Sequence, residues 1–230
     1  MVAILFIGIV AVMVALVAAT VARYQGGRAA WRVLAGLLVW LTYAGLLGCL
    51  GVLKDLSARP PGVVFLVVPV LLFLLVFVAF IVLSTASARV ALAFPLWILL
   101  GAQSFRICVE LFLHQLWIGG LVPRMLTFDG ANVDIYVAAS AALIAWLSTR
   151  GRWGLRIALG WNVLGLLAIT NVVTRAVLTA PGPLNLILTE VPNQLLGTFP
   201  FLFIPGFFVP LDVVLHLLAM RAIASRLRSQ

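Results

Sequence analysis

Long apolar segments, separated by short stretches that carry arginines, most limit what this chain can fold into. Seven can be counted, most of them near the ~20 residues that a helix needs to cross a bilayer. Only 9% of the 230 residues are charged and 65% are hydrophobic, whereas a soluble domain carries about a quarter charged residues. The sequence therefore predicts an all-α polytopic membrane protein, with one domain over 1–230 and seven transmembrane helices. These spans are expected at about 2–22, 33–53, 63–84, 91–118, 135–149, 157–178 and 200–220.

Prolines occur in two of these spans and in one connection between spans. Pro95 should be tolerated in the first turn of the fourth span, and Pro205 and Pro210 should kink the seventh. The connection 181–199 contains Pro-Gly-Pro and Val-Pro-Asn sequences around a short apolar piece. It is too short to cross a bilayer, so we expect an interfacial or re-entrant segment.

The charges between the spans predict orientation. One set of connections carries ten arginines and no acid, and the other carries a mixture of basic and acidic residues. By the positive-inside rule the first side is cytoplasmic, so the N-terminus is outside and the C-terminus cytoplasmic. The first apolar segment has no basic stretch before it, which favours a retained span over a cleaved signal peptide. The ten arginines are Arg23, Arg28, Arg32, Arg89, Arg150, Arg152, Arg156, Arg221, Arg226 and Arg228.

Several classes of function lose support from the composition. The formal net charge is +9, but the arginines are scattered singly between apolar spans, so nucleic acid is not an expected partner. Lys54 is the only lysine, and a retinal protein needs a lysine in its last span. No glycine-rich phosphate loop or catalytic-triad spacing occurs, and the cysteines Cys49 and Cys108 fit small packing residues. The sequence thus leans away from an enzyme and implies no cofactor.

A polar stripe inside the fourth span is the main functional candidate. Gln103, Arg106, Glu110 and His114 are spaced three, four and four residues apart, so they share one face of a helix. Charged residues at hydrocarbon depth are costly, so the stripe should face a protein interior or a wet cavity. At about 1.5 Å per residue, Arg106 lies roughly 22 Å from the cytoplasmic end, near the midplane.

Depth along the spans predicts two pairs, Arg106 with Asp212 and Glu110 with Arg175. A purely structural role, holding the fourth, sixth and seventh spans in register, explains such pairs equally well. If the core instead binds a ligand, we expect it to open toward the outside. The predicted ligand-binding residues are Gln103, Arg106, Glu110, His114, Asn171, Arg175, Asp212 and His216.

Two i, i+4 pairs of metal-ligand types, Glu110 with His114 and Asp212 with His216, suggest an alternative. Their residue types resemble intramembrane hydrolases of the ceramidase type, which hold zinc with histidines and an aspartate. However, His114 and His216 should differ by roughly 20 Å in depth, and the chain has only two histidines. We therefore predict no metal site.

The loop before the fifth span forms a second candidate. The sequence Thr127-Phe128-Asp129-Gly130-Ala131-Asn132-Val133-Asp134 combines acids, an amide and a turn glycine, as in loops that hold cations or polar ligands. It lacks the full calcium-loop pattern, and a solvated loop that caps the fifth span is the simpler interpretation. The outer-loop candidates are Asp129, Asn132, Asp134 and Glu190.

Three motifs resemble those of a family of uncharacterised, hypothetical bacterial multi-pass membrane proteins. They are Arg106-x3-Glu110-x3-His114, Thr127-Phe128-Asp129-Gly130-x-Asn132-x-Asp134, and Trp161-Asn162-x2-Gly165 with Asn171. The resemblance extends from about residue 95 to the C-terminus and includes His216. Asp212 is not part of the pattern, which weakens the Arg106–Asp212 pair. The resemblance implies no activity.

These observations favour a multi-pass protein of the bacterial cytoplasmic (inner) membrane. It should bind a small molecule or ion in a polar core between the fourth, sixth and seventh spans, as a transporter or receptor. The alternatives are an intramembrane metal-dependent hydrolase and a structural membrane subunit without ligand. The bilayer is the expected partner; a protein partner or homo-oligomer is left open.

Reporter fusions test the predicted topology. Fusions after Arg28, Arg89, Arg152 and Gln230 should report the cytoplasm, and fusions after Arg59 and Gly130 the outside. The reason is that short loops rich in arginine resist translocation. A C-terminal fusion that reports the outside would contradict the span count.

Overall fold

The computed structural model describes residues 2–55, 78–80 and 84–229, and within them every regular element is a helix. Five helical segments of this part are long and apolar enough to cross a membrane: Val2–Gln25 (α1), Gly27–Cys49 (α2), Leu96–Ile118, Gly151–Thr179 (α8) and Ile204–Arg228. The chain is thus a helical membrane protein. The predicted third span lies almost entirely outside the described residues. The predicted fifth span is α7 (Asp134–Leu147), an apolar helix of 14 residues, and the count of seven spans stays a prediction.

The first two helices form a hairpin with a turn of one residue. Gly26 separates α1 from α2 and has a φ of 88°, a left-handed conformation that favours glycine. The predicted loop of this region, which was expected to extend to Arg32, is therefore almost entirely helical. Phe6 of α1 is fully buried and stacks on Phe112 with ring centroids 4.8 Å apart. This contact packs the hairpin against the fourth span.

The fourth span is divided at Pro95. A short helix, α4 (Thr85–Ala93), ends before Phe94, which is extended because the proline ring disfavours the helical conformation of the preceding residue. Pro95 therefore lies between two helices and not inside the first turn of one, which corrects the prediction. Beyond it are α5 (Leu96–Gly101), the 3₁₀ turn η2 (Ala102–Phe105) and α6 (Arg106–Ile118).

The last span carries the predicted proline distortion. A π-helical turn, η5 (Ile204–Phe208), precedes α9 (Val209–Arg228). Pro210 has no N–H, so it cannot donate to the carbonyl of Gly206 four residues earlier. The indole Nε1 of Trp40 on α2 donates to that carbonyl at 2.6 Å. A neighbouring helix thus satisfies the group that proline leaves without its usual donor.

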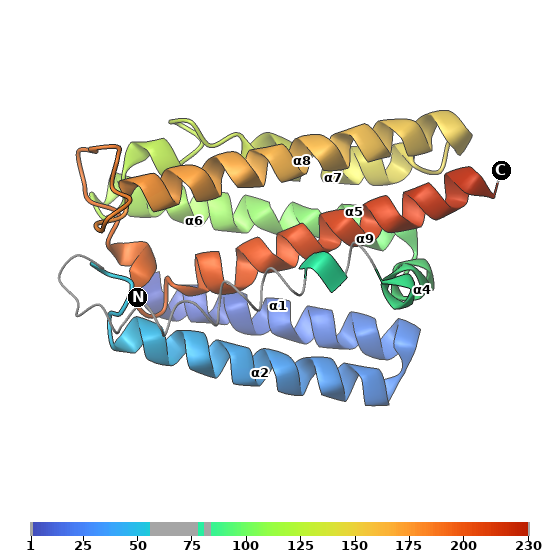
Figure 1. Cartoon of the computed structure of the whole chain (residues 1–230), viewed down its shortest axis with the longest axis horizontal. Helices are drawn as coiled ribbons and strands as arrows, with labels where there is room; N and C mark the ends of the chain where they lie inside the picture. The colour runs from blue at the N-terminus through green and yellow to red at the C-terminus, as the bar shows by residue number, and fades with distance from the viewer. Residues whose placement is uncertain (1, 56–77, 81–83, 230) are drawn as a thin grey trace.

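The helices align so that the connections gather at two ends (Figure 1). The α1–α2 turn, α4, the α7–α8 turn and the C-terminus lie at one end, which we call the arginine end. The α6–α7 loop (119–133) and the α8–α9 segment (180–203) lie at the opposite end, the loop end. The ten arginines of the sequence analysis belong to the first set of segments. The assignment of the arginine end to the cytoplasm stays a prediction.

Replacing Trp40 with Phe tests the role of this tryptophan. The variant leaves the Gly206 carbonyl without a donor, and interhelical hydrogen bonds of this kind are worth about 1–2 kcal/mol in model peptides. We expect a lower melting temperature of the detergent-purified protein. Trp31→Phe is the control, since Trp31 lies on the same helix and is 67% exposed. Equal melting of the two variants would contradict the argument.

Candidate functional site

The predicted polar stripe begins in the 3₁₀ turn and continues along α6. Gln103 is fully buried and its Nε2 donates to the Leu99 carbonyl at 3.3 Å. Arg106 and Glu110 are each 3% exposed. His114, one turn closer to the loop end, keeps 19% of its side chain exposed. The stripe therefore runs from the bundle interior toward the loop end.

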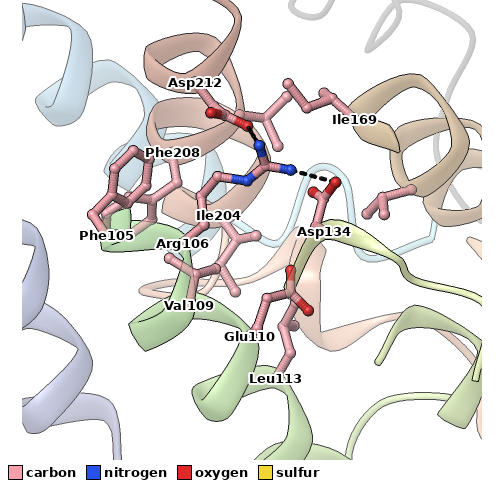
Figure 2. A pocket seen from close by; sticks show the side chains of 12 residues that line it. Phe105, Arg106, Val109, Glu110, Leu113, Asp134, Ile169, Ile204, Phe208 and Asp212 are labelled. Carbon is pink, nitrogen blue, oxygen red and sulfur yellow. Dashed lines mark ion pairs between the residues drawn. The ribbon is translucent and has the colours of Figure 1, made fainter. Parts of the chain in front are cut away.

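The guanidinium of Arg106 lies between two carboxylates, as Figure 2 shows. Its Nη1 is 2.9 Å from Oδ2 of Asp212 on α9, and its Nη2 forms an ion pair with Asp134 on α7. The Arg106–Asp212 pair predicted from depth is confirmed. The Asp134 pair was not predicted. It adds α7, the fifth predicted span, to a core that the sequence placed between the fourth, sixth and seventh.

The prediction that Asp134 belongs to a solvated loop is wrong. It is the first residue of α7, and only 10% of its side chain is exposed. Its backbone N–H donates to Oδ1 of Asn132 at 2.9 Å, a local turn typical of asparagine. That turn directs the Asp134 carboxylate into the bundle, where Arg106 stabilises it.

Glu110 has an amide partner, not the predicted arginine. Nδ2 of Asn132 donates to Glu110 Oε2 at 2.7 Å and to the Leu126 carbonyl at 3.1 Å. Arg175 instead donates from Nε to Oδ1 of Asn171, four residues earlier on α8, at 2.8 Å. The predicted Glu110–Arg175 pair is therefore wrong. An asparagine from the loop occupies the position expected for the guanidinium.

The α6–α7 loop has a fixed structure that covers Glu110. The Thr127 hydroxyl donates to the Arg124 carbonyl at 2.9 Å, and Gly130 packs so closely on the same carbonyl that a Cβ would overlap it. Asn171 donates from Nδ2 to the Ala131 carbonyl at 2.8 Å, which ties the loop to α8. The α6–α7 loop, which contains most of the motif at 127–134, thus covers the polar core.

His216 on α9 is held by the motif Trp161-Asn162-x2-Gly165. Nδ1 of His216 lies 2.8 Å from Oδ1 of Asn162, and the Trp161 ring packs on the imidazole with centroids 5.4 Å apart. A Cβ at Gly165 would overlap the His216 ring. Trp161, Asn162 and Gly165 therefore form a cradle for His216. The sequence analysis gave them no role, although an asparagine inside an apolar span could have indicated one.

The hydrogen bonds define the protonation of the imidazole. Nδ2 of Asn162 donates to the Ala158 carbonyl at 2.7 Å, so the opposite Oδ1 accepts from His216 Nδ1. Nε2 of His216 then accepts from Nη1 of Arg106 at 3.3 Å. This pattern corresponds to a neutral histidine, and it links α8 to the Arg106 cluster.

A separate polar cluster lies at the loop end. Nδ1 of His114 is 3.2 Å from Oδ2 of Asp129, and the imidazole stacks on Phe128 with centroids 4.5 Å apart. Arg124 donates from Nε to the Asp129 carbonyl, and from its backbone N–H to Oε1 of Glu190 at 2.6 Å. This backbone hydrogen bond lowers the pKa of Glu190. The four outer-loop candidates thus separate: Asp129 and Glu190 lie here, and Asn132 and Asp134 in the core.

A cavity of about 40 Å³ adjoins the charged cluster (Figure 2). Arg106, Glu110, Asp134 and Asp212 supply its polar wall, and apolar side chains supply the rest. Among the residues that the structure describes, Oδ1 of Asp212 has no hydrogen-bond partner, although the aspartate is only 3% exposed. At about 10–15 Å³ of probe-occupied space per water, the cavity suits a few waters or a small ion.

This geometry adds no support for the alternative of an intramembrane metal-dependent hydrolase. In the described ranges, no three histidine, cysteine, aspartate or glutamate side chains are grouped to hold a metal ion. His114 contacts Asp129 at the loop end, whereas His216 contacts Asn162 and Arg106 in the interior. The two histidines therefore belong to separate clusters.

Comparison with known proteins assigns the family. Residues 61–224 match the profile of a family described as a domain of unknown function, DUF8737. The chain belongs to this family. The matched range contains Arg106, Glu110, Asp134, Asp212 and His216. No curated protein and no solved structure matches the chain.

Replacing Gly165 with Ala tests the His216 cradle. The added methyl group overlaps the imidazole, so His216 or α9 must shift. We expect a destabilisation of about 1–3 kcal/mol, as for overpacked cores. The measurement is thermal or denaturant unfolding of the purified protein in detergent.

Gly160→Ala supplies the matched control on the same helix. A Cβ there meets no atom within 4 Å, so the change should be neutral or stabilising by helix propensity. If Gly165→Ala were as stable as Gly160→Ala, the packing of His216 against Gly165 would be refuted.

Proposed function

We propose that this protein binds a small cation, a proton foremost, at the buried cluster of Arg106, Glu110, Asp134 and Asp212. It would do so as a transporter or as a receptor. The observation that carries the proposal is the charge of the cluster, which has three carboxylates and one guanidinium; Asp134 and Asp212 pair with the guanidinium, and Glu110 lines the same cavity.

The excess negative charge needs a counter-charge. If all three acids were ionised, the cluster would carry two more negative charges than Arg106 neutralises. The hydrogen bonds of His216 fit its neutral form, and the partner of Glu110 is the uncharged amide of Asn132. A charge at membrane depth costs at least about 2.5–3.5 kcal/mol on insertion scales. Protons or a bound cation remove that cost, and their exchange would make the site functional.

The size of the cavity favours an ion over an organic ligand. A volume of about 40 Å³ beside the acids admits a water, a hydronium or a small monovalent cation. Oδ1 of Asp212 has no hydrogen-bond partner among the described residues, although it lies 3.8 Å from Nε2 of His216, and it offers such a ligand an acceptor. Of the small-molecule and ion ligands expected from the sequence, the ion is the better fit.

A labelled glutamate gives a direct test. The chain has two glutamates, Glu110 and Glu190, so protein with [¹³C]glutamate and Glu190→Gln carries one labelled side-chain carboxyl. In infrared spectra, the intensity of the labelled carbonyl band of the protonated acid should change reversibly with pH. If a metal cation is the ligand, the intensity should change at fixed pH when Na⁺ or K⁺ replaces choline. A band that stays constant under all these conditions would contradict the proposal and favour the structural subunit.

The converse variant is the control. In Glu110→Gln protein the label reports only Glu190, which is exposed and whose pKa is held below its ordinary value by the Arg124 N–H. Its carboxyl should be ionised at neutral pH and insensitive to the cation. Proteoliposomes with an internal pH dye then separate the two functions: a transporter acidifies the lumen under an inside-negative potential, and a receptor does not.

A further inference from the structure

A second pocket lies on the outside of α8, near the loop end. Its volume is about 380 Å³, and one face of the helix supplies most of its wall. Thr170, Thr174 and Leu178 follow one another at intervals of four residues, and so do Asn171 and Arg175, so all five share that face. Asn171 and Arg175 were predicted to bind a small molecule or ion in the polar core; in the structure they line this second pocket.

The segment after α8 closes one side of this pocket. The backbone N–H groups of Leu186 and Ile187 both donate to the Leu178 carbonyl at 3.0 Å, so the segment folds back over the end of the helix. Ile187 then lines the pocket, while Leu186 and Leu188 are 74% and 91% exposed. Exposed leucines of this kind are stable when they enter lipid.

The polar lining carries a positive charge. Of the residues that the structure describes, Arg175 is the one cation in the lining, and no carboxylate belongs to it. Asn171 accepts from Nε of Arg175, which orients the guanidinium. Among the described residues neither Nη atom has a partner, and the exposed Thr174 adds a hydroxyl group, whereas the Thr170 hydroxyl donates to the Leu166 carbonyl at 2.8 Å. Arginine with hydroxyl donors is a combination that recognises phosphate.

The depth of Arg175 places this charge at the level of lipid headgroups. It lies 18 residues beyond Ile157, where the apolar part of α8 begins, which is about 27 Å at the helical rise. The hydrocarbon core is about 30 Å thick, so Arg175 is close to its far boundary.

We propose that this pocket binds the phosphate group of a membrane phospholipid, in the leaflet at the loop end. Arg175 and Thr174 hold the phosphate, and Leu167, which is 61% exposed on the same face, contacts the acyl chains. The exposed leucines around the pocket favour a lipid over a free anion. This site is independent of the cation proposed for the Arg106 cluster.

Native mass spectrometry of the detergent-purified full chain tests the site. Phosphatidylglycerol should bind at one tight site per chain, and diacylglycerol, which lacks the phosphate, should bind at least about tenfold more weakly. Arg175→Gln should weaken phosphatidylglycerol binding by about tenfold, the loss expected of one charge-assisted hydrogen bond. The control Arg152→Gln removes an exposed arginine at the other end of α8 and should leave the affinity unchanged.

Each remaining outcome decides the proposal. Equal binding of the two lipids would overturn it, as would equal losses in the two arginine variants. Inorganic phosphate that saturates the site and displaces phosphatidylglycerol would show a free-anion site and overturn the lipid. If Arg175→Gln does not fold, Thr174→Val decides, because its side chain is exposed and its shape is preserved. A several-fold loss supports the site, and an unchanged affinity refutes it.

Discussion

The burial of one guanidinium organises this bundle. Arg106 extends from α6 to Asp134 on α7, to Asp212 on α9 and to His216, which Asn162 on α8 holds in place. Removing one partner of a buried ion pair typically costs about 3–5 kcal/mol, because the other charge is then stranded. Because both Asp134 and Asp212 pair with Arg106, either one can still neutralise it if the other is removed. The arrangement also creates a surplus of acid, and the proposed ion site rests on this surplus.

The motifs at 127–134 and 161–165 supply uncharged partners for the buried charged groups. Asn132 satisfies Glu110 and turns the chain into α7, while Asn162 fixes the imidazole that accepts from Arg106. Each of these motifs also contains a glycine in close contact: the backbone of Gly130 approaches the Arg124 carbonyl, and Gly165 leaves room for the ring of His216. Glycine and asparagine therefore recur together for a steric reason. Uncharged amides complete the network without adding to the cost of burial.

Helical periodicity and depth account for the parts of the core that the sequence predicted correctly. Helical spacing placed Arg106 and Glu110 on one buried face, and helix rise placed Arg106 level with Asp212, which the structure confirms. Prediction failed where a loop enters the core, because loops have no period: Asn132 and Asp134 could not be told from a solvated turn. Span boundaries failed for a related reason. Turn residues decide them locally, as at Gly26 and Phe94.

Asn171 joins the interior to the surface. Its Nδ2 donates to the Ala131 carbonyl of the loop that covers Glu110, and its Oδ1 accepts from Arg175 in the pocket on the outside of α8. The two regions have opposite surpluses, acid inside and base outside. A carboxylate at this position would pair with Arg175 but repel the loop carbonyl, and a lysine or arginine would do the reverse. Only a side chain with both a donor and an acceptor, and without charge, serves both contacts. The asparagine at this position holds Arg175 in the pocket on the outside of α8, while Glu110 pairs with the Asn132 amide in the core.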